Sequence, residues 1–211
     1  MDKIICVGKN YAEHVKELGD ITVDKPVIFL KPPSVLRQAK QGETLTVSMP
    51  THQGSVHHEC EIVFQLKAGG FQMTETEAER CIGAVSVGLD MTLRDKQAIL
   101  KKTGAPWTIA KVFQDSAIVG PWVSLEEFPQ FSNAVFSLKV NGELRQEGRA
   151  TEMTFSPPKC IAYISEHFPL CAGDIIFTGT PKGVNSILPS DTGNLNFGPI
   201  QFSVQWYELK S

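Results

Sequence analysis

The order of apolar and polar residues along the chain predicts a molecule built mainly from strands. The clearest alternation lies near the end of the chain, where polar residues separate Ile200, Phe202, Val204 and Trp206. A period of two predicts a strand with one buried face. Short apolar runs predict further strands, and we expect them at residues 3–7, 26–30, 44–47, 82–89 and 175–178.

A hairpin and a small number of helices complete the pattern. Asn141-Gly142 separates two short strand patterns, and this dipeptide favours a two-residue turn between paired strands. Asn10, Thr74 and Thr92 are side chains of the kind that cap the first turn of a helix. We expect helices that begin at these caps and at Ser156, and that run to about Leu18, Arg80, Lys102 and His167.

The predicted strands do not alternate regularly with the predicted helices. This order disfavours a doubly wound parallel sheet and favours one β-rich α+β domain. No internal repeat, low-complexity tract or linker divides the sequence. We therefore expect a single catalytic domain over residues 1–211.

Composition and charge argue against several classes of partner. The 211 residues carry a formal net charge of −3 without a block of like charges, which disfavours nucleic acid and anionic membranes. No apolar stretch is long enough to span a bilayer, and the first apolar run is too short for a signal peptide. The five cysteines are scattered without a Cys-x-x-Cys pair, which favours a reducing cytoplasm over a disulfide framework or a thiolate zinc site.

Two carboxylates stand two residues apart in a segment with the composition of a strand. Side chains at i and i+2 share a face of a strand, so Glu59 and Glu61 project together while Cys60 points the other way. Two adjacent like charges resist burial unless a cation joins them. The pair therefore indicates either a metal site or a solvated strand face. His57 and His58 are adjacent, which makes it difficult for both to reach one ion and disfavours zinc.

A second polar group follows the predicted strand at 82–89. Asp90 stands at the end of that strand, and Arg94 and Gln97 share an otherwise apolar face of the helix that follows. Polar residues within a core-facing stripe predict a lined cavity, although Arg and Gln also lie over apolar surfaces for ordinary reasons.

Two further positions carry chemistry that the sequence leaves open. His14 and Glu17 are three residues apart on the first predicted helix, so they are neighbours. They form either a surface ion pair or a histidine base oriented by a carboxylate. Lys111 lies between two large apolar residues on one face of a strand that we expect at 107–113. Such a lysine is either exposed or held for a purpose.

Several segments, in this order, resemble the signatures of the fumarylacetoacetate hydrolase superfamily. Each segment alone is a weak signal, whereas their order is specific, and the resemblance extends from Ile5 to about Val184. The pattern is most similar to the small acylpyruvase, oxaloacetate decarboxylase and fumarylpyruvate hydrolase branch. The segments are residues 6–14, 57–61, 88–95, 106–111, 140–146 and 179–184.

This resemblance implies a mixed β-sheet roll, a homodimer and a divalent metal, usually Mg²⁺ or Mn²⁺. Glu59, Glu61 and Asp90 match its metal ligands. Asn185-Ser186 stands where the family usually continues with glycine, so the shape of the substrate loop is not implied. The other matching positions are His14, Glu17 and Lys111 as catalytic residues, and Arg94, Gln97 and Thr180 as substrate contacts.

The implied ligand set suggests the chemistry. Three carboxylates without a thiolate suit Mg²⁺, Mn²⁺ or Ca²⁺ better than Zn²⁺. A small 2-oxo acid offers such an ion a carboxylate oxygen and a keto oxygen, and the ion then stabilises a developing enolate.

The leading hypothesis from the sequence is a hydrolase that cleaves a C–C bond in acylpyruvates, which are 2,4-dioxo acids. Glu17 and His14 would activate water, and Lys111 would stabilise oxyanion charge. The alternative is a lyase or isomerase, which would act by oxaloacetate decarboxylation or tautomerisation or by a hydroxymuconate-type isomerase step. A hypothesis from another class is a metal-containing scaffold without activity. Hydrolysis and decarboxylation share the enolate of pyruvate, so the sequence does not separate them.

Overall fold

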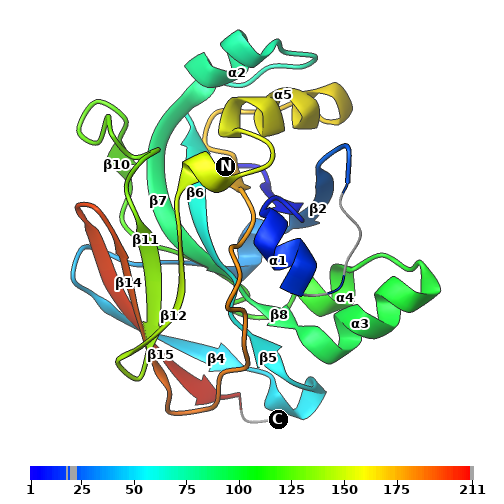
Figure 1. The fold of residues 1–211 in the computed structure, drawn as a ribbon, viewed down its shortest axis with the longest axis vertical. Helices are drawn as coiled ribbons and strands as arrows, with labels where there is room; N and C mark the ends of the chain where they lie inside the picture. Colours follow the sequence, from blue (N-terminus) through cyan, green and yellow to red (C-terminus); the bar gives the residue numbers. More distant parts are fainter. Residues whose placement is uncertain (18, 20–22, 210–211) are drawn as a thin grey trace.

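The computed structural model describes residues 1–17, 19 and 23–209, and its largest sheet has eight strands (Figure 1). The strand order is β2-β1-β13-β6-β7-β9-β3, with β10 beside β7. Only the pairs β1–β13 and β3–β9 among these are parallel, so the sheet is mixed. The strands are β1 (Ile4–Gly8), β2 (Val27–Lys31), β3 (Leu36–Gln38), β6 (Cys60–Leu66), β7 (Ile82–Asp90), β9 (Ala117–Val119), β10 (Val123–Ser124) and β13 (Ile175–Phe177).

A second sheet of five strands has the order β12-β11-β14-β15-β4, and a third sheet pairs β5 with β8. In Figure 1 the second sheet lies beside the long curved strands β6 and β7. The expected β-rich α+β class with mixed sheets is confirmed. The strands are β4 (Thr44–Met49), β5 (Val56–His57), β8 (Thr92–Leu93), β11 (Phe136–Val140), β12 (Glu143–Gly148), β14 (Thr192–Phe197) and β15 (Ile200–Glu208).

The helices are short and lie at the edges of the sheets. Helices α2 and α5 lie together at one end of the molecule, and α1, α3 and α4 lie on the side that carries β2 (Figure 1). No helix among the described residues is long and apolar enough to cross a membrane. The helices are α1 (Ala12–Glu17), α2 (Glu75–Cys81), α3 (Arg94–Thr103), α4 (Thr108–Lys111) and α5 (Pro157–His167), with 3-10 turns at Pro33–Val35, Thr51–Gln53 and Ala150–Glu152.

The main core fills the space between the two large sheets. The alternating apolar residues of β15, which include Phe202 and Trp206, are buried as the pattern predicts. Phe197 packs edge-on against Phe128 and Phe136, with ring centroids 5.0 and 6.1 Å apart. Phe136 and Phe197 lie on the second sheet and Phe128 follows β10, so this packing joins the second sheet to the segment after β10, the strand that pairs with β7.

Several local predictions are confirmed. Thr74 and Glu77 form a reciprocal capping box at the start of α2, and the Ser156 side chain caps α5. Asn141 and Gly142 have φ values of 52° and 84°, as a two-residue hairpin turn between β11 and β12 requires.

Two predicted caps are wrong because their side chains are used elsewhere. Asn10 is buried, and its amide donates to the carbonyls of Phe155 and Thr178 rather than capping a helix. Thr92 lies in β8 and donates to the carbonyl of Asp90, so α3 begins after Leu93 without a side-chain cap. The predicted end of the first helix at Leu18 lies outside the described residues.

The strand predicted at residues 107–113 is a short helix instead. The backbone N–H groups of Ala110 and Lys111 donate to the carbonyl of Trp107, which closes a helical turn. Ile109 points outward and is 62% exposed, whereas Lys111 is buried. The apolar composition therefore reflects packing against β2, where Trp107 contacts the ring of Phe29. The expectation that Lys111 and Ile109 share one face is therefore wrong.

Candidate active site

Two adjacent strands and the residue before one of them bring together a group of carboxylates. Glu61 lies on β6, Glu59 immediately precedes that strand, and Asp90 ends the neighbouring strand β7. The strands are paired in register, and the N–H of Asp90 donates to the carbonyl of Glu59 at 2.9 Å. Ligand oxygens of the three side chains lie within 4.8 Å of one another, and all three are buried. The solvated strand face is therefore excluded for Glu59 and Glu61.

A buried lysine and a half-buried arginine neutralise much of this negative charge. Lys111 Nζ lies 2.6 Å from Glu59 Oε2 and 2.7 Å from Asp90 Oδ2, and Arg94 Nη2 lies 2.5 Å from Glu59 Oε1. Lys111 is thus held inside the site rather than on a surface.

Sequence reasoning missed Lys31. Its side chain is fully buried, and its Nζ lies 2.8 Å from Asp90 Oδ1. The same group donates to the carbonyls of Met91, Lys111 and Ser116. The one signal in the sequence is a lysine that follows an apolar run and stands before Pro32, which is weak by itself.

The surroundings push the acidities of the two glutamates apart. Burial raises the pKa of Glu59, but the charges of Lys111 and Arg94 outweigh burial and hold that pKa well below its usual range. Burial raises the pKa of Glu61, and the negative charges of Asp90 and Glu59 raise it further. A pair of carboxylates with opposed shifts is typical of a functional site.

These residues fit a hard divalent metal. The site offers carboxylate oxygens and no thiolate, which is the donor set that Mg²⁺ and Mn²⁺ prefer. The cluster of ligand atoms found among the described residues contains neither His57 nor His58. His58 instead contacts the amide of Gln146 through Nδ1, and burial lowers the pKa of His57 to about 4. The structure therefore gives no support to zinc.

His14 and Glu17 form the expected pair on α1. His14 Nδ1 lies 3.1 Å from Glu17 Oε2, and His14 is 6% exposed. A carboxylate accepts hydrogen bonds, so Nδ1 carries the proton and Nε2 keeps its lone pair. The N–H of Gly183 donates to both oxygens of Glu17, at 3.0 and 3.2 Å. Burial lowers the pKa of His14 despite the nearby charge of Glu59.

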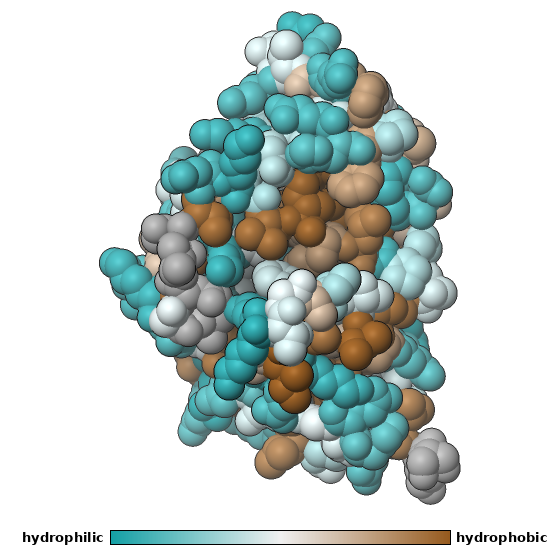
Figure 2. All heavy atoms as spheres, turned by 90° about the vertical axis from the view of Figure 1, so that its right-hand side faces the viewer, coloured by the Kyte–Doolittle hydropathy of each residue, from teal (hydrophilic) through white to brown (hydrophobic). Residues whose placement is uncertain are grey.

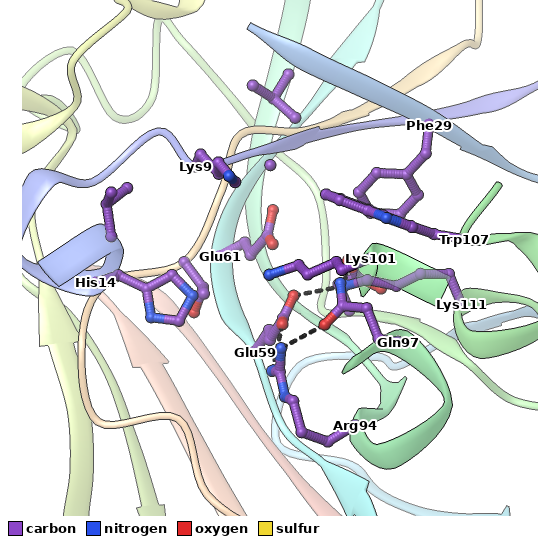
Figure 3. A pocket seen from close by; sticks show the side chains of 15 residues that line it. Lys9, His14, Phe29, Glu59, Glu61, Arg94, Gln97, Lys101, Trp107 and Lys111 are labelled. Carbon is purple, nitrogen blue, oxygen red and sulfur yellow. Dashed lines mark hydrogen bonds and ion pairs between the residues drawn. The ribbon is translucent and has the colours of Figure 1, made fainter. Parts of the chain in front are cut away.

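The carboxylates and His14 meet at one cavity of about 430 Å³, measured with its mouth included. His14 enters from α1, and Arg94 and Gln97 lie across from it on α3, with Glu59 and Glu61 between them (Figure 3). Arg94 Nη1 donates to Gln97 Oε1 at 2.6 Å. Other lining residues are Val7, Gly8, Lys9, Val15, Phe29, Asp90, Lys101, Trp107, Lys111 and Thr180. Glu17 contacts His14 from outside this lining.

The loop after Gly183 adds a short pairing to β5. The N–H of His58 donates to the carbonyl of Asn185, and the N–H of Ile187 donates to the carbonyl of Val56. Ser186 forms a bridge with His57. In Figure 1 this orange segment runs between β12 and α1. The residues that replace glycine are therefore accommodated as an extended segment beside the acidic cluster.

Comparison with known proteins places the chain in a family. The chain is 40% identical over 200 residues to oxaloacetate tautomerase YcgM of Escherichia coli, covering 93% of this chain and 89% of that protein. It is 42% identical over 188 residues to human mitochondrial oxaloacetate tautomerase FAHD1, with coverages of 89% and 83%. A fumarylpyruvate hydrolase from Pseudomonas aeruginosa, solved with Mn²⁺ and pyruvate, superposes with a TM-score of 0.92 at 33% identity, covering 98% of this chain and 90% of that one.

The family assignment rests on a match over most of the sequence as well as on these relatives. The family described as "Fumarylacetoacetate (FAA) hydrolase C-terminal" matches residues 3–201. The match includes each strand and helix that contributes to the cavity. The chain therefore belongs to the fumarylacetoacetate hydrolase family, as the motifs of the sequence indicate.

Proposed function

We propose that this protein is a divalent-metal-dependent tautomerase that interconverts the enol and keto forms of oxaloacetate or a similar small 2-oxo dicarboxylic acid. The observation that carries the proposal is a buried cluster of Glu59, Glu61 and Asp90 facing a neutral His14 across one small cavity. The similarity to oxaloacetate tautomerases supports this reaction over C–C hydrolysis. Tautomerisation, which was the alternative from the sequence, is therefore the main proposal, and acylpyruvate hydrolysis takes second place.

Glu59, Glu61 and Asp90 would hold Mg²⁺ or Mn²⁺. Such an ion would supply Lewis-acid chemistry that polarises the keto group of a 2-oxo acid and makes the neighbouring C–H bond more acidic. Lys111 fixes the orientation of Glu59 and Asp90, and Lys31 fixes that of Asp90, through the short contacts described above. Arg94 is placed to attract a substrate carboxylate.

His14 is the group that would move the proton. Its Nε2 would take a proton from C3 of the keto form and deliver it to the oxygen on C2, which gives the enol, and the reverse transfer would regenerate the keto form. Glu17 would hold the ring and stabilise the imidazolium in between. Gln97 and Thr180 line the same cavity and would contact the polar ends of the substrate. Phe29 and Trp107 lie on the wall of the cavity, where they limit the access of water.

Hydrolysis of acylpyruvates is the second candidate, and the similarity to a fumarylpyruvate hydrolase supports it. In that reaction the His14–Glu17 pair would activate water instead of removing a proton from carbon. The two candidates therefore use the same residues and differ in whether water enters.

A substrate panel separates the two reactions. The protein with Mn²⁺ is given oxaloacetate, acetylpyruvate or fumarylpyruvate, and enol loss and C–C cleavage are followed separately. We expect enol–keto conversion of oxaloacetate at a kcat/KM at least about tenfold above that for cleavage of either acylpyruvate, a difference of about 1.4 kcal/mol in barrier. Faster cleavage of an acylpyruvate would instead establish the hydrolase.

We also propose that the protein forms a homodimer in a reducing compartment such as the cytoplasm. Figure 2 shows the side that carries β2, α3 and α4, where apolar side chains gather around a hollow. Residues 27–33 and 104–108 line a groove there, and Leu30 is 40% exposed. β2 is also the last strand of its sheet. An exposed apolar groove at a free sheet edge supports pairing with a second copy.

A further inference from the structure

One buried amide connects the second sheet to the candidate site. Gln146 lies on β12 and is 1% exposed. Its Oε1 accepts from the N–H of Cys60 at 2.9 Å and contacts His58 Nδ1 at 2.8 Å. Its Nε2 donates to Thr180 Oγ1 at 2.8 Å and to the carbonyl of Pro181 at 2.9 Å. The backbone partners fix the orientation of this amide, so His58 Nδ1 is a donor.

The side-chain amide of Gln146 lies where the strands β13 and β6 cease to pair. β13 pairs with β6 only as far as Phe177 and Val63, and Thr178 adds two bonds to the carbonyl of Ile62. Beyond that point the chain after β13 leaves β6. The backbone groups of Cys60 point to this side, because the carbonyl of the preceding residue, Glu59, accepts from the N–H of Asp90 on β7. They would otherwise be buried without partners.

Two side chains form the hydrogen bonds to the backbone of Cys60 that a paired strand would otherwise supply. Gln146 Oε1 takes the N–H of Cys60, and Thr180 Oγ1 donates to the carbonyl of Cys60 at 2.9 Å. Gly179, which precedes Thr180 in the loop that leaves β6, donates its N–H to Glu61 Oε2 at 2.7 Å. The segment between the two glutamates and the loop that lines the cavity are therefore held by one connected set of hydrogen bonds.

We propose that Gln146 is a positioning residue that sets the spacing of Glu59 and Glu61 with its acceptor end and the place of Thr180 with its donor end. The proposal rests on the metal-binding and substrate-binding roles given to these residues under the proposed function. Gln146 touches neither the cavity nor a carboxylate of the cluster, so it acts through Cys60 and the loop. Partners of this kind affect metal affinity and activity strongly.

The first test replaces Gln146 with methionine, which keeps the length of the side chain and removes both polar ends. The matched control is Gln65→Met on the same strand as Glu61, because no side-chain hydrogen bond of Gln65 is found in the described part of the chain. Mn²⁺ alone is titrated into each protein, and the thermal midpoint is measured with and without Mn²⁺. We expect Gln146→Met to raise the Kd for Mn²⁺ about 10-fold to 100-fold and Gln65→Met to leave it unchanged.

The thermal midpoints separate positioning from general stability. A ligand stabilises the folded state according to its affinity, so a loss of positioning reduces the shift that Mn²⁺ causes. A purely structural role lowers the midpoint equally with and without Mn²⁺. Equal lowering, together with an unchanged Kd for Mn²⁺, would overturn the proposal.

A second variant, Gln146→Glu, tests the donor end alone and serves if the methionine variant fails to fold. It keeps an acceptor for Cys60 but offers at most one proton where the amide offers two. We expect Mn²⁺ to bind as tightly as in the wild type or more tightly, while the KM for oxaloacetate rises more than kcat falls. An unchanged KM would contradict the role at Thr180. Wild-type protein that binds Mn²⁺ but does not convert oxaloacetate would contradict the proposed function and leave the Mn²⁺ result to decide on Gln146.

Discussion

At the scale of single residues, the site is a balance of buried charges. Glu59, Glu61 and Asp90 are buried together. The ammonium groups of Lys31 and Lys111 lie directly against Asp90, and that of Lys111 also lies against Glu59. Each charge would be costly to bury alone, whereas the mixed cluster is stabilised by short contacts. The arrangement leaves Glu61 with a raised pKa, so one carboxylate needs a further cation to ionise fully. A divalent ion meets that need.

The pKa of His14 leads to a prediction for the pH dependence of the reaction. Burial lowers this pKa below its ordinary value of 6.5, so His14 is a neutral base at pH 7. With saturating Mn²⁺, we expect kcat/KM to be constant near neutral pH and to fall only when the pH drops below 6.5, as His14 becomes protonated.

The variant His14→Asn should lose about 10²-fold to 10⁴-fold in kcat and should lack this acid limb. His167→Asn, on the exposed end of α5, is the control and should behave as the wild type. An acid limb that persists in His14→Asn would show that another group titrates.

The sequence and its family resemblance identified most of the side chains that the structure brings together at this scale. The i, i+2 spacing predicts that Glu59 and Glu61 project together but leaves a solvated face open, and the convergence of Asp90 with them was implied by the family resemblance; the structure brings the three together. The pair of His14 and Glu17 also forms as expected. Lys31 was not predicted, because its partners come from distant positions such as Ser116, and no local pattern records them.

At the scale of elements, local capping signals were reliable where the cap is exposed. Thr74 and Glu77 form their capping box on the surface, where both residues are exposed. Asn10 and Thr92 carry the same local signal but are buried, and tertiary partners take their side chains. The strand predicted at 107–113 failed for a related reason, because the packing of Trp107 and the burial of Lys111 override β propensity.

Removal of the cap at α2 should affect stability but not activity. Thr74→Ala loses the bonds between its hydroxyl and Glu77, so we expect the free energy of unfolding to fall by about 1 kcal/mol. α2 contributes no residue to the lining of the cavity, so kcat and KM should remain unchanged. Urea denaturation measures the free energy of unfolding, and the oxaloacetate assay measures kcat and KM. A changed KM would contradict the prediction that the cap of α2 affects stability alone.

At the scale of the whole molecule, strand patterns predicted the fold class but not the pairing of strands. The alternation in β15 is local and was clear, whereas its parallel pairing with β4 joins residues about 160 positions apart. The implied mixed roll is found. The side-chain link from β12 to the strand of Glu61 could not be read from either segment alone.

The proposed homodimer leads to a test on the face of β2. Leu30→Glu places a charge in the apolar groove and should convert the dimer to a monomer in sedimentation experiments. Leu144→Glu is the control, since Leu144 is 52% exposed on β12 of the other sheet. A wild-type monomer, or a dimer that survives Leu30→Glu, would contradict this interface.

The most direct test of the whole account is the dependence of oxaloacetate tautomerisation on the acidic cluster and its metal. The rate is measured on metal-stripped wild-type protein, after addition of Mn²⁺ or Mg²⁺, and on the double variant Glu59→Gln plus Glu61→Gln. We predict a rate near the uncatalysed background without metal, recovery on addition of either ion to the wild type, and no recovery in the variant. A full rate in the metal-stripped wild type or in the double variant would contradict the account.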